Sequence, residues 1–128
     1  MMEFSLKKIL VAEDDKSLSH SIDTWLTLEG FQVESVFNGE EALHKILHDK
    51  YDLLITDIAM PRLNGIDLIS QTRHINPNLP IMVVSGKLSP ELIANLHSMA
   101  VQHVLSKPIK PVQFRRKIEE LFPNQVYL

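Results

Sequence analysis

The sequence predicts an α/β fold with one open, doubly wound sheet of five parallel strands and helices on both faces. Short continuous apolar runs alternate with amphipathic stretches along the chain. Apolar strands without polar alternation need cover on both faces, which is typical of parallel sheets. Closed (β/α) barrels need eight such units, so the five units found here indicate an open sheet. Right-handed crossovers leave few strand orders, and 2-1-3-4-5 is the favoured one.

The first half of the chain contains three predicted strands, over residues 9–12, 31–37 and 53–55. Between the first two strands, apolar residues recur at helical spacing until Gly30 ends the helix. Asn38-Gly39 is a turn or cap signal, and a second apolar helical stripe follows it. Thr56-Asp57 follows the apolar run of the third strand.

The second half continues the same alternation. Met60-Pro61 and Asn64-Gly65 interrupt the chain before a third helix, and a fourth strand is expected over 80–84. Ser89 is a predicted N-cap, followed by a proline at the first helical position. The fifth strand is expected over 103–105, and the last helical stripe runs from 114 to 122.

Length and composition exclude several classes of protein. We expect one domain over residues 1–128, with its core at about 7–122. Cysteine is absent, which excludes disulfides and thiolate metal sites. The net charge of −3 argues against direct nucleic-acid binding. No apolar run is long enough for a membrane span, and the first residues lack a hydrophobic signal region, so we expect a cytoplasmic protein without a membrane partner.

Polar residues follow the predicted strands at their carboxyl ends, where open α/β sheets bind ligands. These residues are Glu13, Asp14 and Asp15 after the first strand, Asp57 after the third, Ser85 at the end of the fourth, and Lys107 after the fifth. The predicted topology therefore gathers carboxylates, a hydroxyl and an ammonium at one edge.

This set of groups suits phosphoryl transfer. Carboxylates packed together repel one another unless a cation is present, and oxygen ligands without cysteine favour a hard cation such as Mg²⁺. Lys107 and Ser85 offer a positive charge and a hydroxyl donor to phosphate oxygens. Asp57 would be the nucleophile and would form an acyl phosphate.

The ordered set of motifs resembles the receiver domain of two-component response regulators, a CheY-like family with a flavodoxin-like fold. The resemblance covers roughly residues 7–122 and is specific because each motif follows its own predicted strand. It is carried by Glu13-Asp14, by Asp57 in Asp57-Ile58-Ala59-Met60-Pro61, by Asn64-Gly65, by Ser85 and by Lys107-Pro108.

The resemblance implies a role for each residue. Asp57 would accept a phosphoryl group from a histidine kinase or a phosphotransfer protein. Asp14, Asp57 and the backbone carbonyl of Ala59 would bind Mg²⁺, with Glu13 acting through water. Ser85 and Lys107 would bind the phosphoryl group, and the Lys107–Pro108 peptide would be cis. Phosphorylation would change the face formed by the fourth helix, fifth strand and fifth helix, which would bind an unknown downstream protein or output domain. Such a domain is no enzyme in the usual sense, because it catalyses only its own phosphorylation and dephosphorylation.

Five positions depart from the family pattern or vary within it. Receivers usually carry an aromatic switch residue three positions before the lysine, and Val104 has no ring to rotate. The usual Gly-Ala pair before it reads Ala100-Val101. Ala59 and Lys87 occupy the variable positions that tune the phosphoryl lifetime, so we expect an altered dephosphorylation rate.

These residues also allow other interpretations. Acids after the first strand also suit a helix N-terminus, and Asp15 is expected to be a cap or to face solvent. A metal-dependent phosphohydrolase would carry a second acid where Ala59 lies. A flavin- or nucleotide-binding domain would have a loop rich in Gly, Ser and Thr after the first strand. The remaining alternative is a degenerate receiver that acts as a phosphorylation-independent interaction module.

Overall fold

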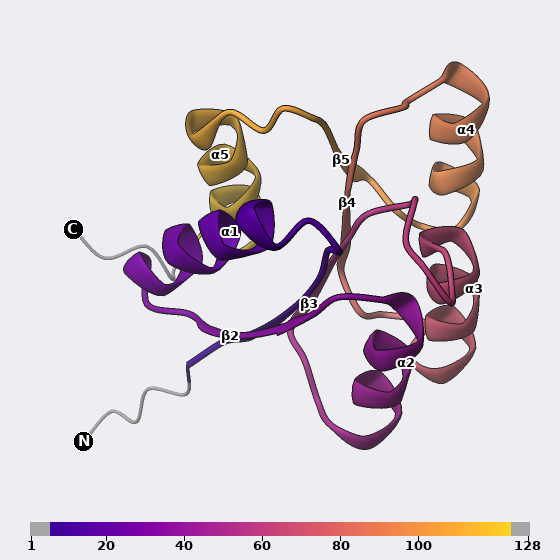
Figure 1. The fold of residues 1–128 in the computed structure, drawn as a ribbon, viewed down its shortest axis with the longest axis horizontal. Helices are drawn as coiled ribbons and strands as arrows, with labels where there is room; N and C mark the ends of the chain where they lie inside the picture. Colours follow the sequence, from indigo (N-terminus) through magenta and orange to yellow (C-terminus); the bar gives the residue numbers. More distant parts are fainter. Residues whose placement is uncertain (1–5, 124–128) are drawn as a thin grey trace.

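The computed structural model describes residues 6–123, and its sheet has the predicted topology. The five strands are all parallel in the order β2-β1-β3-β4-β5 (Figure 1). Their bounds are Lys8–Ala12 for β1, Gln32–Val36 for β2, Leu53–Thr56 for β3, Ile81–Ser85 for β4 and His103–Ser106 for β5. The predicted fold class and strand order are confirmed.

Five helices alternate with the strands, as the apolar periodicity predicts. Their bounds are Lys16–Leu28 for α1, Gly39–His48 for α2, Gly65–Ile75 for α3, Pro90–Ser98 for α4 and Pro111–Leu121 for α5. Helices α1 and α5 cover one face of the sheet, and α2, α3 and α4 cover the other (Figure 1). No helix within residues 6–123 combines the length and apolar character needed to cross a membrane.

Alternate side chains of each strand enter two separate cores, because successive residues of a strand point to opposite faces. In β1, Ile9 and Val11 pack towards α1 and α5, whereas Leu10 packs towards the other three helices. In β4, Met82 and Val83 divide in the same way. Both faces are therefore apolar, which explains the continuous apolar runs in the sequence.

Side-chain caps define where four of the helices begin. The side chains of Asp15, Asn38, Asn64 and Ser89 each accept a hydrogen bond from a backbone N–H in the first turn. Each cap of this kind stabilises its helix by about 1 kcal/mol. The expected cap role of Asp15 and the predicted start of α4 at Ser89 are confirmed.

Helices α1 and α4 are each followed by a residue with a left-handed φ, a glycine after α1 and an alanine after α4. Gly30 has a φ of 93° after α1, and the Phe31 N–H donates to the Leu26 carbonyl at 3.1 Å. Ala100 has a φ of 61° after α4. Strand β2 begins at Gln32, one residue later than predicted, because the Phe31 N–H closes the helix end instead of joining the sheet.

One arginine fastens the edge of the molecule opposite the carboxyl ends of the strands. The Arg73 guanidinium, on α3, donates to the carbonyl oxygens of Leu79 at 2.6 Å, Met99 at 2.9 Å and Ala100 at 3.1 Å. Leu79 lies just before β4, whereas Met99 and Ala100 follow α4. A single side chain therefore ties α3 to the segment before β4 and to the end of α4.

Candidate functional site

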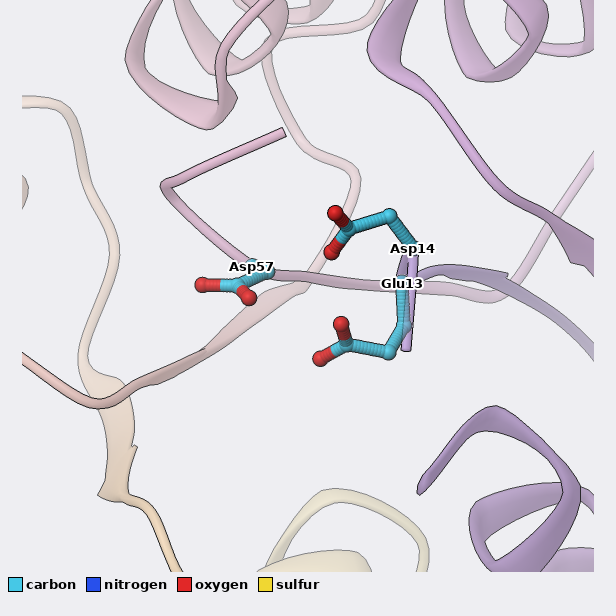
Figure 2. A group of neighbouring side chains, drawn as sticks. All are labelled: Glu13, Asp14 and Asp57. Atoms are coloured by element: carbon cyan, nitrogen blue, oxygen red, sulfur yellow. The ribbon is translucent and has the colours of Figure 1, made fainter. Parts of the chain in front are cut away.

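Three carboxylates gather at the carboxyl ends of the two central strands. Glu13 and Asp14 follow β1, and Asp57 follows β3 (Figure 2). One oxygen of each side chain lies within 4.8 Å of the others. Parallel pairing of Ala12 with Thr56 brings these strand ends together. Glu13 and Asp57 are buried, whereas Asp14 is exposed, so the group opens to solvent on one side.

Lys107 brings a positive charge to this acidic group from the end of β5. Its Nζ lies 2.6 Å from Asp57 Oδ2 and 2.7 Å from Glu13 Oε1. Burial on its own lowers the pKa of Lys107, but the bonds to Asp57 and Glu13 outweigh it and raise the pKa. Lys107 is therefore held in its ammonium form. The Lys107–Pro108 peptide is cis, as the resemblance implies.

Glu13 is the carboxyl group of the site whose ionised form is disfavoured by burial. Its pKa is raised, with burial as the largest cause, and the charge of Asp57 adds to the rise. The ammonium of Lys107 and the Asp15 N–H, which donates to Glu13 Oε2 at 3.0 Å, act in the opposite direction without cancelling it. The ionised carboxylate is thus less well stabilised here than in water.

The donor set fits a hard divalent cation. Three carboxylates face one lysine, which leaves an excess of negative charge. Within residues 6–123, Glu13 Oε1 is buried and accepts no hydrogen bond of good geometry, although Lys107 lies beside it. All the ligand atoms are oxygens, which Mg²⁺ prefers. Burial and, to a lesser degree, the charge of Asp57 raise the pKa of Glu13, and a cation here would stabilise its ionised form against both.

The backbone and one oxygen of Asp57 are held in place. Its N–H donates to the Ala12 carbonyl at 3.1 Å, and the Thr56 hydroxyl donates to its carbonyl at 2.8 Å. The Ile58 N–H donates to Asp57 Oδ1 at 2.6 Å, while Oδ2 faces Lys107. The carboxylate therefore has a fixed orientation before any ligand arrives.

Ser85 lies at the end of β4 and is buried. Its carbonyl accepts a hydrogen bond from the Lys107 N–H at 2.9 Å, and its Oγ accepts one from the Lys87 N–H at 3.3 Å. The structure thus ties Ser85 to Lys107 through the backbone. In the part of the chain that the structure describes, no hydrogen bond joins the Ser85 hydroxyl to Asp57.

Two of the tuning and switch positions follow strand ends, and the third lies within β5. Ala59, on the segment after β3, and Lys87, after β4, are both exposed. Val104 on β5 is half-buried and packs against the core under α2, α3 and α4. The neighbouring His103 lies on the opposite strand face, where its Nδ1 is 3.9 Å from Glu120 Oε2 of α5. The effects of these residues on signalling stay predictions.

Two glycines next to the site have a role that the sequence interpretation missed. A methyl group at Gly65 would lie 2.1 Å from the Asp57 carbonyl oxygen, and one at Gly39 would lie 1.9 Å from the Leu63 carbonyl oxygen. Both glycines follow a capping asparagine, so the Asn-Gly pairs explain the start of each helix. Nothing in these local signals indicates the approach of a distant backbone.

Comparison with known proteins gives a family match over most of the chain. The family model of the response regulator receiver domain matches residues 9–119. The chain is 32% identical over 116 residues to the response regulator receiver protein CpdR of Brucella abortus, covering 91% of this chain and 97% of that protein. It is 40% identical over 82 residues to the transcriptional regulatory protein CpxR homolog of Haemophilus influenzae, covering 64% of this chain.

The chain matches some relatives over part of their length only. It spans 35% of the CpxR homolog and 34% of an uncharacterized transcriptional regulatory protein, YcbL, of Bacillus subtilis. Among solved structures, a CheY-like receiver domain protein of Methanospirillum hungatei superposes with a TM-score of 0.88 at 29% identity, covering 94% of this chain and 97% of the other. Sequence, strand order and structural likeness agree, and the chain belongs to the response regulator receiver domain family.

Proposed function

We propose that this receiver domain takes a phosphoryl group onto Asp57 from the phosphohistidine of a histidine kinase or a phosphotransfer protein. The observation that supports this function is the arrangement around Asp57. Its Oδ2 is 2.6 Å from the Lys107 ammonium, and oxygens of Glu13 and Asp14 lie within 4.8 Å of an Asp57 oxygen and of each other. A carboxylate nucleophile beside a cation and further acidic ligands is the arrangement that phosphoryl transfer needs.

In this reaction a carboxylate oxygen of Asp57 attacks phosphorus, and the bond from phosphorus to the histidine nitrogen breaks. The product is an aspartyl phosphate on this chain and a free histidine on the donor. The Ile58 N–H holds Oδ1 in place, which presents Oδ2 towards the site. The Lys107 ammonium then pairs with oxygens of the transferred group, and the buried Ser85 hydroxyl donates to another of them.

Mg²⁺ would be held by Asp14, Asp57 and the backbone carbonyl of Ala59, with Glu13 binding it through a water molecule. When bound, the ion neutralises negative charge on the phosphoryl oxygens. The excess of carboxylates over lysine supports this assignment. The domain acts on no separate substrate, because the phosphoryl group is transferred to its own side chain and then to water.

The output of the switch is the surface formed by α4, β5 and α5. Ser85 precedes α4 and Lys107 lies between β5 and α5, so a phosphoryl group bound by both residues acts on the segments that lead into both helices of this surface. The partner is a downstream protein or an output domain of a longer regulator. A transcriptional regulatory relative, of which the chain spans 35%, supports the second form.

The test is the intact mass of the protein after incubation with acetyl phosphate and Mg²⁺. We expect one added phosphoryl group that is absent without Mg²⁺ and absent in Asp57→Asn. Glu34→Gln, on the edge strand β2 and outside the acidic group, is the matched control and should be modified like the wild type. No adduct on a rapid timescale, together with no binding of beryllofluoride, would contradict the proposal and favour a phosphorylation-independent interaction module.

A further inference from the structure

The segment between β3 and α3 carries Asp57 and Ala59 and folds back tightly. The Leu63 N–H donates to the Pro61 carbonyl at 2.8 Å, which closes a three-residue turn around Arg62. Arg62 has a φ of 70°, a left-handed conformation that costs free energy for any residue with a side chain. Such turns are rare and strained, so the surrounding structure must hold this one in place.

The start of helix α2 lies against this turn. A methyl group at Gly39 would lie 1.9 Å from the Leu63 carbonyl oxygen and 2.8 Å from its carbonyl carbon. Gly39 does not have a left-handed φ, so an alanine could adopt its backbone conformation. Space, and not conformational freedom, is therefore what requires glycine at this position.

The start of α2 cannot easily move away from the turn. Val36 pairs with Ala12 in the sheet only three residues before Gly39. Asn38 is buried, and its side chain caps the helix by accepting the Glu41 N–H at 2.8 Å. An added side chain at Gly39 must therefore displace the Leu63 carbonyl and not the helix.

The first residue of α3, two positions after the turn, is in direct contact with the backbone of the acceptor residue. Gly65, two residues after Leu63, lies so close to Asp57 that a methyl group there would be 2.1 Å from the Asp57 carbonyl oxygen. The Gly65 N–H also donates to the Ile58 carbonyl at 2.8 Å. A shift at Leu63 thus reaches Asp57 and Ile58 through one short, tightly packed stretch.

We propose that Gly39 is a positioning residue of the phosphoryl site, which acts through Leu63 to hold the segment that carries Asp57 and Ala59. This inference rests on the proposed function, because it assigns Gly39 to the same site. The residue touches neither the phosphoryl group nor the cation. Because Gly39 has no side chain, the start of α2 can pack directly against the backbone of the strained turn.

The experiment compares Gly39→Ala with two controls in the metal-free protein. Gly86→Ala adds the same methyl group where nothing lies within 4 Å of it. Ile46→Val removes a methylene from the buried face of α2 and serves as a control for lost stability. Hydrogen exchange of the Ile58 and Gly65 amides is measured by NMR, and the Mg²⁺ dissociation constant is measured by chemical-shift titration.

We expect both amides of Gly39→Ala to exchange at least about tenfold faster than in Ile46→Val. Its Mg²⁺ affinity should fall about tenfold, as for residues that orient metal ligands indirectly. Gly86→Ala should match the wild type in exchange and affinity, whereas Ile46→Val should match it in affinity and exchange faster only in proportion to its lost stability. Unchanged amide exchange in a folded Gly39→Ala protein, or equal changes in Ile46→Val, would overturn the proposal.

A second variant covers the case in which Gly39→Ala does not fold. Arg62→Gly removes the strain of the turn, so the double variant can fold with a displaced Leu63. The proposal expects fast amide exchange at Ile58 and Gly65 in this double variant, and wild-type exchange there would overturn it. Failure of acetyl phosphate to modify the wild type would count against the proposed function alone, because amide exchange does not depend on phosphorylation.

Discussion

The two ends of the sheet each hold a lysine between two carboxylates, yet the two clusters differ in character. At the carboxyl ends of the strands, Lys107 Nζ lies 2.7 Å from Glu13 and 2.6 Å from Asp57. At the opposite end, Lys8 Nζ lies 2.7 Å from Glu34 and 2.6 Å from Asp49. The two lysine side chains are 23% and 25% exposed, so their distances and exposure are nearly equal.

Burial of the acids accounts for the difference. The side chains of Glu34 and Asp49 are 30% and 48% exposed, whereas those of Glu13 and Asp57 are 0% and 7% exposed. Hydrogen bonds from Lys8, and with smaller effect from Tyr51 and Lys45, lower the pKa of Glu34, whereas burial raises the pKa of Glu13 despite Lys107. A lysine satisfies exposed acids, but it leaves buried acids in need of a further cation.

Addition of Mg²⁺ is the test of this difference with the largest expected effect on stability. At about 1,000 times its dissociation constant, Mg²⁺ should raise the free energy of unfolding by about 4.1 kcal/mol, because it binds only the folded site. Thermal unfolding with and without Mg²⁺ measures the effect. Asp14→Asn should remove most of the gain and Glu34→Gln should keep it. Equal losses in the two variants would show that the ends do not differ in cation binding.

Replacing each lysine by methionine breaks the two clusters in turn. In the absence of Mg²⁺, Lys107→Met should destabilise the fold by about 3 kcal/mol, because two buried carboxylates lose their partner. Lys8→Met should cost clearly less, since water can solvate its exposed acids. Urea unfolding at pH 7 measures both changes. A larger loss in Lys8→Met would contradict the importance of burial.

The pH dependence of stability should have opposite signs for the acids of the two clusters. This is the smallest of the expected effects. The raised pKa of Glu13 means that its contribution is present below pH 4.5 and is lost as the pH rises through the folded value. The lowered pKa of Glu34 means that its contribution is present above pH 4.5 and is lost as the pH falls through the folded value.

Urea unfolding of the metal-free protein from pH 3 to 8 measures these slopes. Glu13→Gln should reduce the loss of stability above pH 4.5, and Glu34→Gln should reduce the loss below it. The same change of slope in both variants would show that the two acids are in equivalent environments.

The fold could be predicted from the sequence because its local patterns agree with one another. Continuous apolar runs mark strands with two buried faces, and Gly30 and Ser89 mark helix ends that the structure confirms. Ala100 shows where local patterns fail, because nothing in an alanine indicates a φ of 61°. The bond from the Arg73 side chain to the Ala100 carbonyl, which supports this conformation, joins residues 27 apart in the sequence.

The candidate site was predictable as a set of residues but not as a set of contacts. Topology places Glu13, Asp57 and Lys107 at neighbouring strand ends, and the structure brings their charged groups within hydrogen-bonding reach. The close approach of Gly39 to the Leu63 carbonyl depends on how α2 packs beside a segment that is distant in the sequence. Sequence periodicity identifies which face of a helix is buried but not which backbone atom approaches it.

The three hydrogen bonds from Arg73 give α4 a mechanical asymmetry. Two of them hold Met99 and Ala100 at the carboxyl end of the helix and the third goes to Leu79, whereas the first turn of α4 follows the segment after Ser85. The nine residues of α4 make a helix about 13 Å long that is held at its carboxyl end by Arg73 and can pivot there. A displacement near Ser85 is therefore applied at the end farthest from the pivot, where the least force is needed to swing the helix. A lysine could not provide this pivot, since its point charge lacks the planar fork that spans several carbonyls.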